Sequence, residues 1–329
     1  MVGGNISSEK IDLLVYGPNK PIVDNGFSDQ FVLHPFETRA DLDRLNPVVA
    51  GKIRGAAVTY STVRCDGAMM ALFPKLEVVA SFGVGYDHVD ANYAREHNIV
   101  VTNTPDVLTE EVADVAMGLL IATLREFVKA DKYLRSGLWM TQQFPLSVGS
   151  LRDRKVGIVG MGRIGQAIGR RLEASRVPVV YHSRNPANGV AYKHYPDLIE
   201  MAKAVDTLVV IVPGGPATAK MINADVMKAL GPRGVIINVA RGSVVDEEAM
   251  IAALKSGTIL AAGLDVFAKE PAVPDELRAM QNVVLLPHIG SASVVTRNAM
   301  DQLVVDNLKA WFAGKAPLTP IAETPVTGR

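Results

Sequence analysis

The stretch that decides the fold is KVGIVGMGRIGQAIGRRL, residues 155–172. A short β-branched run leads directly into Gly160, Gly162 and Gly165, in Gly-x-Gly-x-x-Gly spacing, and the pattern that follows predicts a helix. The first glycine permits a tight turn, the second lets the backbone approach a pyrophosphate, and the third allows close packing. A glycine-rich turn without a ligand is the alternative. Because strand, motif and helix occur together, the stretch predicts a dinucleotide-binding turn whose helix amides face the phosphates.

Short apolar, β-branched runs alternate with helical patterns on both sides of this motif, which is typical of parallel sheets with crossover helices. One series precedes residue 104 and a second begins at residue 155. We therefore expect an α/β fold of two doubly wound parallel-sheet domains, one flavodoxin-like and one a Rossmann dinucleotide-binding domain, with an active-site cleft between them. The expected boundaries are 1–103 with 291–329 for the substrate domain and 104–290 for the dinucleotide-binding domain.

Helix signals refine this picture. Residues 109–137 predict one long helix that begins at a Thr109 cap, and its apolar residues on more than one face favour burial against a second copy. Asp246 is suited to cap the helix that follows it, and Gly257 to end that helix. A last helix over 294–312 is expected to return to the first domain.

Composition excludes several classes of function. Lys plus Arg equals Asp plus Glu, at 34 each in 329 residues, so no net field would attract nucleic acid or a membrane surface. The single cysteine, Cys65, cannot form an internal disulfide, and the N-terminal residues lack an apolar signal core, so a cytoplasmic location is expected. His, Cys and carboxylate residues show no metal-ligand spacing, and no metal is expected.

The end of the second strand of the later series, VVYHSRNP (179–186), bears on cofactor choice. An NAD site usually places a carboxylate here to bind the ribose 2′-hydroxyl, whereas this turn offers His182, Ser183 and Arg184. A hydroxyl and a guanidinium suit an additional phosphate, so the turn predicts NADPH in preference to NADH. A solvent-facing turn without any role in selectivity is the alternative.

Three residues further along carry the chemistry: Arg241 in INVARGSVVDEEAM, Glu270 in GLDVFAKEP and His288 in LLPHIGSAS. Reduction of a 2-oxo acid needs a fork that holds the carboxylate and an acid that protonates the new alkoxide. A carboxylate beside His288 should favour its imidazolium form and orient the ring. Taken singly, each could be an ordinary surface or loop residue. The other histidines are interpreted as structural or solvent-exposed: His34, His88, His97, His182 and His194.

These motifs, together with SFGVGYDHVD (81–90) and NTPDVLTEEVAD (103–114), resemble the D-isomer-specific 2-hydroxyacid dehydrogenases over residues 75–291. Within that family the chain is most similar to the glyoxylate and hydroxypyruvate reductases. The resemblance implies NADPH-dependent reduction of small 2-oxo acids. It also implies that Arg241 binds the substrate carboxylate and carbonyl oxygen, that His288 is the acid and base, and that Glu270 is its partner.

The same resemblance and the glycine motif imply two wider sets of contacts. The expected cofactor-binding residues are Thr109, Gly160, Met161, Gly162, Arg163, Ile164, Gly165, Ser183, Arg184, Val212, Pro213, Thr218, Val239, Ala240, Asp265 and Gly290. The expected substrate-binding residues are Val63, Val84, Gly85, Arg241, His288, Ser291 and Trp139. Trp139 resembles a tryptophan that some of these reductases insert into the partner subunit's pocket, and ordinary packing is its alternative. A homodimer is expected on either interpretation.

Other functions remain open on the sequence alone. A 2-oxogluconate reductase or a short phosphoglycerate dehydrogenase would use the same residues. A non-enzymatic sensor of nicotinamide cofactors would retain the fold, although the complete Arg, Glu and His set favours catalysis.

Overall fold

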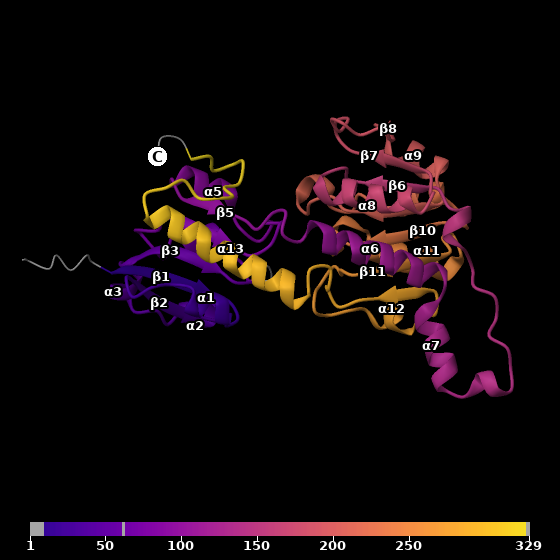
Figure 1. Cartoon of the computed structure of the whole chain (residues 1–329), viewed down its shortest axis with the longest axis horizontal. Coiled ribbons are helices and arrows are strands. Elements are labelled where there is room, and N and C mark those ends of the chain that lie inside the picture. The colour runs from indigo at the N-terminus through magenta and orange to yellow at the C-terminus, as the bar shows by residue number, and fades with distance from the viewer. Residues whose placement is uncertain (1–9, 61–62, 327–329) are drawn as a thin grey trace, which may run out of the picture. The chain divides into compact units, whose positions relative to one another are not determined.

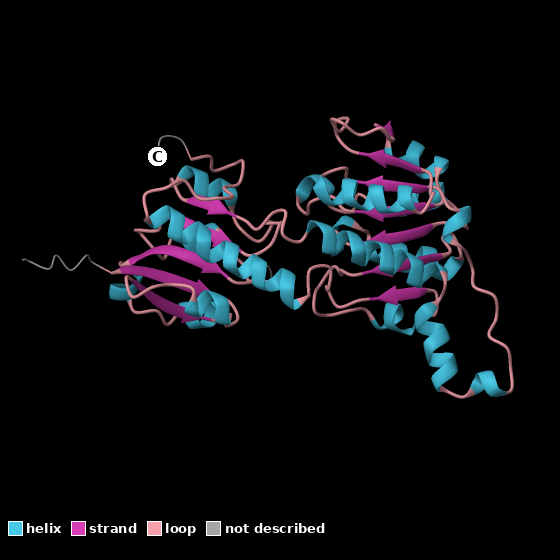
Figure 2. Ribbon diagram, viewed as in Figure 1, coloured by secondary structure: helices cyan, strands magenta, loops and turns pink. Residues whose placement is uncertain are grey.

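A computed structural model describes residues 10–60 and 63–326. The chain forms two compact units: Met1–Val107 with Ser293–Arg329, here called unit 1, and Leu108–Ala292, called unit 2. This division falls at residues 107/108 and 292/293, against the expected 103/104 and 290/291. Figure 1 follows the chain through both units, and Figure 2 marks their helices and strands. In the described part of the chain, no helix is both long and apolar enough to cross a membrane.

Unit 1 is built on a parallel sheet of order β2-β1-β3-β4-β5. Its strands are β1 (Ile11–Tyr16), β2 (Phe31–Phe36), β3 (Ile53–Val58), β4 (Val78–Ser81) and β5 (Val100–Thr102). Its helices are α1 (Pro21–Asn25), α2 (Arg39–Leu42), α3 (Pro47–Ala50), α4 (Gly67–Met70), α5 (Ala91–Glu96) and α13 (Val294–Phe312). The last helix packs against α1, β3 and β4. A Cβ on Gly55 of β3 would lie 2.9 Å from the ring of Phe312, so this glycine lets the end of α13 lie close to the sheet.

Unit 2 is built on a parallel sheet of order β12-β11-β10-β9-β6-β7-β8. Its strands are β6 (Val156–Val159), β7 (Val179–His182), β8 (Lys193–Tyr195), β9 (Thr207–Val210), β10 (Val235–Asn238), β11 (Ala261–Leu264) and β12 (Val283–Leu285). Its main helices are α6 (Thr109–Leu124), α7 (Phe127–Arg135), α8 (Arg163–Ala174), α9 (Leu198–Ala204), α10 (Ala224–Leu230), α11 (Glu247–Ser256) and α12 (Asp275–Ala279). The expected α/β class with two parallel sheets is confirmed.

The helix expected over residues 109–137 is two helices. Glu126 has a left-handed backbone (φ +52°), which ends α6 and turns the chain into α7. The predicted Thr109 cap is also wrong: Leu108 is the N-cap residue, and no side chain accepts a hydrogen bond there. Asp246 does cap α11, by accepting from the amide of Ala249, and Gly257 ends that helix in a left-handed conformation, as predicted.

The apolar faces of α6 are covered within the chain itself. The helix packs against α8 and against β10, β11 and β12, so its apolar residues do not require a second copy. Exposed apolar side chains instead gather on the segment that follows, residues 127–148, which we call the arm. Figure 1 shows α7 and the loop after it projecting from the rest of unit 2. The exposed side chains are Phe127, Val128, Leu134, Leu138, Trp139, Met140, Leu146 and Val148.

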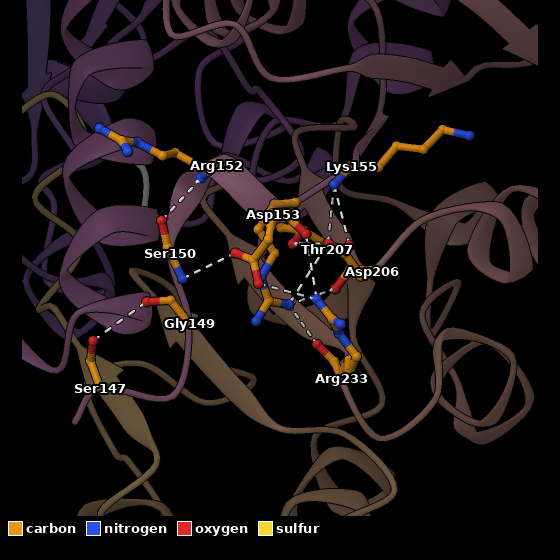
Figure 3. A network of polar contacts seen from close by, with 10 residues as sticks. Ser147, Gly149, Ser150, Arg152, Asp153, Lys155, Asp206, Thr207 and Arg233 are labelled. Carbon is orange, nitrogen blue, oxygen red and sulfur yellow. Dashed lines mark hydrogen bonds and ion pairs between the residues drawn. The ribbon is translucent and has the colours of Figure 1, made fainter. Parts of the chain in front are cut away.

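Arg154, which is 3% exposed, holds the chain at the amino-terminal edge of the sheet, where the chain returns from the arm. Its Nη1 donates to the carbonyl oxygen of Arg233 at 2.6 Å and lies 3.7 Å from the carboxylate of Asp206. Arg233 in turn contacts the carboxylate of Asp153 at 3.2 Å (Figure 3). Burial lowers the pKa of Arg154, and the neighbouring carboxylates oppose that shift. These bonds tie the base of the arm to the segments that lead into β9 and β10.

Gly263 in β11 tests how closely α6 must approach the sheet. A Cβ there would lie 2.6 Å from Thr123 Oγ1 and 2.8 Å from Leu119 Cγ, both on α6. We expect Gly263→Ala to lower the free energy of unfolding by about 1–3 kcal/mol, the usual cost of overpacking a core. The shift in the midpoint of urea unfolding, at an unchanged dependence on urea concentration, measures this effect.

Gly118→Ala, on α6 itself, is the matched control, because a Cβ there meets nothing within 4 Å. Replacing a mid-helix glycine should raise stability by about 0.5–1 kcal/mol. A Gly263→Ala protein as stable as the wild type would contradict the close packing of α6 on β11.

Candidate active site

The glycine turn lies between β6 and α8 and has the geometry that a bound pyrophosphate requires. Gly160 has a positive φ of +105°, and a Cβ on Gly165 would lie 2.1 Å from the carbonyl oxygen of Gly160. A Cβ on Gly162 would meet nothing within 4 Å, so the backbone is open there to an approaching group. The first turn of α8 holds no acidic residue, and its amides suit an anion. These residues fit the phosphates of a dinucleotide.

The other residues expected at the cofactor follow the carboxyl ends of neighbouring strands of unit 2, where open parallel sheets form their ligand crevice. Thr218 donates its hydroxyl to the carbonyl oxygen of Pro213 at 2.7 Å, which joins two of them. By strand, they are Ser183 and Arg184 after β7, Val212 and Pro213 after β9, Val239 and Ala240 after β10, Asp265 after β11, and Gly290 after β12. The remaining member outside the glycine turn, Thr109, begins α6.

His288 and Glu270 form a pair. Nδ1 of His288 lies 2.7 Å from Oε2 of Glu270, and the other carboxylate oxygen of Glu270 accepts from the amide of Phe267 at 3.0 Å. Since the carboxylate only accepts, Nδ1 of the imidazole carries the hydrogen of this bond. The bond orients the ring and leaves Nε2 as the nitrogen that can exchange a proton with a substrate.

The charge on Glu270 is stabilised where it lies. Burial raises the pKa of Glu270, but the bonds from His288 and Phe267 and the charges of His288 and Arg241 outweigh burial and hold it below its usual value. Because this pKa is lowered in the folded state, the ionised carboxylate stabilises the fold at pH values above the ordinary pKa of a glutamate. That contribution is lost as the pH falls through the lowered value.

Asp265 holds the backbone beside His288. The residue is 1% exposed, and its carboxylate accepts from the amides of Ile289 at 2.7 Å and Gly290 at 2.8 Å. His288 itself has a left-handed backbone (φ +54°), which an ordinary residue adopts only under constraint. We therefore assign Asp265 a positioning contact with the histidine loop, beyond the cofactor contact expected from the sequence.

Arg241 is brought to the same segment by a glycine that sequence reasoning did not single out. A Cβ on Gly242 would lie 1.9 Å from the carbonyl carbon of Phe267, so the turn after β10 touches the segment that leads to Glu270. Nη1 of Arg241 donates to the carbonyl oxygen of Ala240 at 2.8 Å. In the sequence, the one sign of Gly242 is its position directly after the arginine. The requirement for glycine there depends on a contact with a segment that is distant in sequence.

The turn after β7 holds Ser183 and Arg184 and no carboxylate, as the sequence has it. The hydroxyl of Ser183 donates to the carbonyl oxygen of Asn185 at 2.6 Å and thereby shapes the turn. This hydroxyl would have to rotate before it could donate to a phosphate. The guanidinium of Arg184 makes no hydrogen bond or ion pair within the described part of the chain, which leaves its donors available.

The expected substrate residues are spread over both units. Arg241, His288 and Ser291 belong to unit 2, and Val63, Val84 and Gly85 to unit 1. Val63 lines a pocket of about 470 Å³ in unit 1, whose other walls include Tyr16, Thr38, Arg39 and Arg64.

Trp139 is not brought to the other substrate residues of unit 2. It lies in a short 3-10 helix, Leu138–Met140, on the arm and is 64% exposed. The base of the arm is fixed at the amino-terminal edge of the sheet, whereas Arg241 and His288 follow the carboxyl ends of β10 and β12.

Comparison with known proteins gives these residues a context. Residues 117–290 match the model of the D-isomer specific 2-hydroxyacid dehydrogenase NAD binding domain. The chain belongs to this family. It is an NAD(P)-dependent D-2-hydroxyacid dehydrogenase. Its high similarity to proteins named as glyoxylate/hydroxypyruvate reductases supports the glyoxylate reductase branch. The resemblance read from the motifs is thereby confirmed.

Three relatives show how similar the chain is to known proteins. A glyoxylate/hydroxypyruvate reductase A of Arabidopsis thaliana is 45% identical over 95% of this chain and 99% of its own. A 2-ketogluconate reductase of Gluconobacter oxydans is 40% identical, with the same coverage. The crystal structure of an NADPH-dependent glyoxylate/hydroxypyruvate reductase from Sinorhizobium meliloti, in complex with NADP and malonate, is 53% identical. It covers 98% of this chain and 99% of that one, with a TM-score of 0.93.

Glu270→Gln removes the charge that supports His288 and keeps the shape of the side chain. We expect kcat for 2-oxo acid reduction to fall by about 10²-fold, the lower end of what a general acid contributes, because the imidazolium loses its carboxylate. Steady-state rates of the variant and the wild type measure this effect.

Glu247→Gln is a suitable control, since its carboxylate also accepts from a backbone amide, that of Ala268, but contacts no histidine. An unchanged kcat in Glu270→Gln would contradict the proposed support of His288 by Glu270.

Proposed function

We propose that this protein reduces glyoxylate and hydroxypyruvate to the 2-hydroxy acids, with NADPH as the preferred cofactor. The observation that carries the proposal is the His288–Glu270 pair, 2.7 Å apart and joined to the Arg241 turn through Gly242 and Phe267. A carboxylate-binding fork, an oriented acid and a dinucleotide turn are the parts that reduction of a 2-oxo acid requires.

Each residue then has a defined role. Arg241 binds the substrate carboxylate through two parallel donors, which fixes the face of C2 that is presented for reduction. NADPH, when bound, supplies the hydride to C2. Nε2 of His288 donates a proton to the carbonyl oxygen as it becomes an alkoxide, and Glu270 stabilises the imidazolium before that transfer. In oxidation His288 begins neutral and accepts the proton, so reduction should prefer lower pH than oxidation.

The preference for NADPH rests on the turn after β7. A carboxylate at this place would repel a 2′-phosphate, whereas Arg184 offers a guanidinium that pairs with phosphate in two-point fashion. The Sinorhizobium meliloti relative, which is described as NADPH-dependent, supports the same choice.

The choice of substrate rests on the relatives. Two of those described above are named as glyoxylate/hydroxypyruvate reductases, which favours small 2-oxo acids. The Gluconobacter oxydans relative favours 2-ketogluconate as a second candidate. Because one methylene in a pocket changes binding by about 1–3 kcal/mol, an enzyme of this kind can turn over several of these acids.

Oxidation of NADPH and NADH at 340 nm, with glyoxylate, hydroxypyruvate, pyruvate and 2-oxogluconate offered in parallel, tests the proposal. We expect glyoxylate or hydroxypyruvate to give the highest kcat/KM. NADPH should exceed NADH by about 10- to 100-fold, which corresponds to one charge-assisted bond of about 1.5–3 kcal/mol. A preference for NADH would overturn the cofactor assignment, and a preference for 2-oxogluconate would favour the second substrate candidate.

Arg184→Ala is the control for cofactor choice in that panel. It should lower kcat/KM for NADPH by the same factor and leave NADH nearly unchanged. An equal loss for both cofactors would show that Arg184 does not act on the 2′-phosphate.

We also propose that the protein is a homodimer formed through the arm. Large apolar side chains gathered on one segment mark an interaction surface, and Trp139 and Met140 are 64% and 90% exposed there. Because the arm is based at the edge of the sheet opposite to Arg241 and His288, Trp139 is better placed to serve a partner subunit's site than its own.

Sedimentation equilibrium of the wild type and of a Trp139→Ser, Met140→Ser variant tests the dimer. The wild type should be a dimer at micromolar concentration, and the variant should dissociate at least tenfold more readily, because each exposed side chain would be covered in the interface. Trp139→Ser alone should raise KM for the 2-oxo acid if its ring lines the partner's pocket. A monomeric wild type would contradict the proposal.

A further inference from the structure

Two histidines lie where the pairing of β7 and β8 ends, at the turn expected to select the cofactor. The ladder runs to the pair His182 and Tyr195, and beyond it β7 continues into Ser183 and Arg184. His194 places Nε2 2.9 Å from the carbonyl oxygen of Ser183, and His182 places Nδ1 2.9 Å from that of Tyr195. Because a carbonyl oxygen only accepts, each ring nitrogen must carry the hydrogen. The bond from His194 thus extends the contact between the two strands to Ser183, one residue beyond the last backbone pair.

His194 is held in place by its neighbour across the strands. It is paired in register with Tyr181, which is 2% exposed, and their ring centroids lie 5.1 Å apart. The hydroxyl of Tyr181 accepts from the amide of Ala187 at 3.0 Å, at the far end of the same turn. One aromatic platform therefore fixes both ends of residues 183–187.

The middle of the turn is fixed as well. Ser183 Oγ donates to the carbonyl oxygen of Asn185 at 2.6 Å, across Arg184. Arg184 is consequently the residue whose backbone is held from both sides while its side chain extends into solvent. The bond from His194 is the contact by which the sheet itself fixes the carbonyl group directly before Arg184.

We propose that His194 is a specificity-determining positioning residue: by holding the Ser183 carbonyl group it places Arg184 to bind the 2′-phosphate of NADPH. The inference rests on the proposed use of NADPH. A guanidinium held near its bound position loses less conformational freedom on binding than one on a mobile turn, so the bond should raise affinity for the phosphate. NADH has a hydroxyl at that position and should depend little on the bond.

The test compares His194→Ala with His194→Gln, whose side-chain amide can supply a donor near the position of Nε2. We expect His194→Ala to raise KM for NADPH about five- to tenfold, with kcat and KM for NADH nearly unchanged, and His194→Gln to recover much of the loss. Calorimetric binding of adenosine 2′,5′-bisphosphate and of 5′-AMP gives a readout that is independent of turnover. The ratio of the two affinities should fall by the same factor in His194→Ala.

His97→Ala is the matched control, since its Nδ1 lies 2.9 Å from the carbonyl oxygen of Tyr93 on α5 of unit 1. It removes an imidazole contact of the same kind and should leave both cofactors unaffected. Thermal unfolding of each variant checks that the fold survives. If His194→Ala proves unstable, Tyr181→Phe provides a second test. This variant removes the acceptor for the amide of Ala187 and should selectively weaken the binding of NADPH.

The outcomes separate the two proposals. A wild type without preference for NADPH or for the bisphosphate overturns the proposed cofactor and this inference with it. A wild type that prefers NADPH, together with a His194→Ala protein that keeps the same ratio or loses both cofactors equally, overturns the role of His194 alone.

Discussion

The arrangement of the candidate site depends on one close contact between backbones, at Gly242. A Cβ there would lie 1.9 Å from the carbonyl carbon of Phe267 and 2.0 Å from its oxygen, distances that a side chain could not occupy. The contact joins the turn of Arg241 to the segment that leads to Glu270, and Glu270 meets His288. Each residue of the proposed mechanism is thus placed by the approach of chain segments that follow β10, β11 and β12. A larger residue at 242 would force these segments apart.

The parts of this arrangement that the sequence predicts are those set by short-range rules. Three glycines between a strand and a helix define a phosphate-binding turn because each spacing has a local steric reason. Asp246 and Gly257 mark the ends of α11 for the same kind of reason, and the structure confirms both. All strands of both sheets except β8 were also predictable, since buried parallel strands are apolar along their whole length. The strand β8 (Lys193–Tyr195) was missed because it is polar and only partly buried.

The parts that could not be predicted depend on residues distant in sequence. Nothing in the pattern of residues 109–137 marks Glu126 as left-handed, so α6 and α7 were predicted as one helix. The apolar faces of α6 suggested a second copy because their partners, α8 and the strands β10 to β12, cannot be assigned without the fold. Likewise the need for glycine at 242 arises from Phe267, and the contact of His194 from the carbonyl oxygen of Ser183.

Two carboxylates lie close to His288 in the folded chain, and their environments shift their pKa values in opposite directions. Burial raises the pKa of Asp265 in spite of the amides of Ile289 and Gly290, whereas the bonds and positive charges around Glu270 outweigh its burial and lower its pKa. The carboxylate that bonds the imidazole is therefore the one whose charge the site stabilises most. A carboxylate bonded to amides fixes the position of the loop, and one bonded to the ring supports its charge. This division of roles is what a histidine that gains and loses a proton requires.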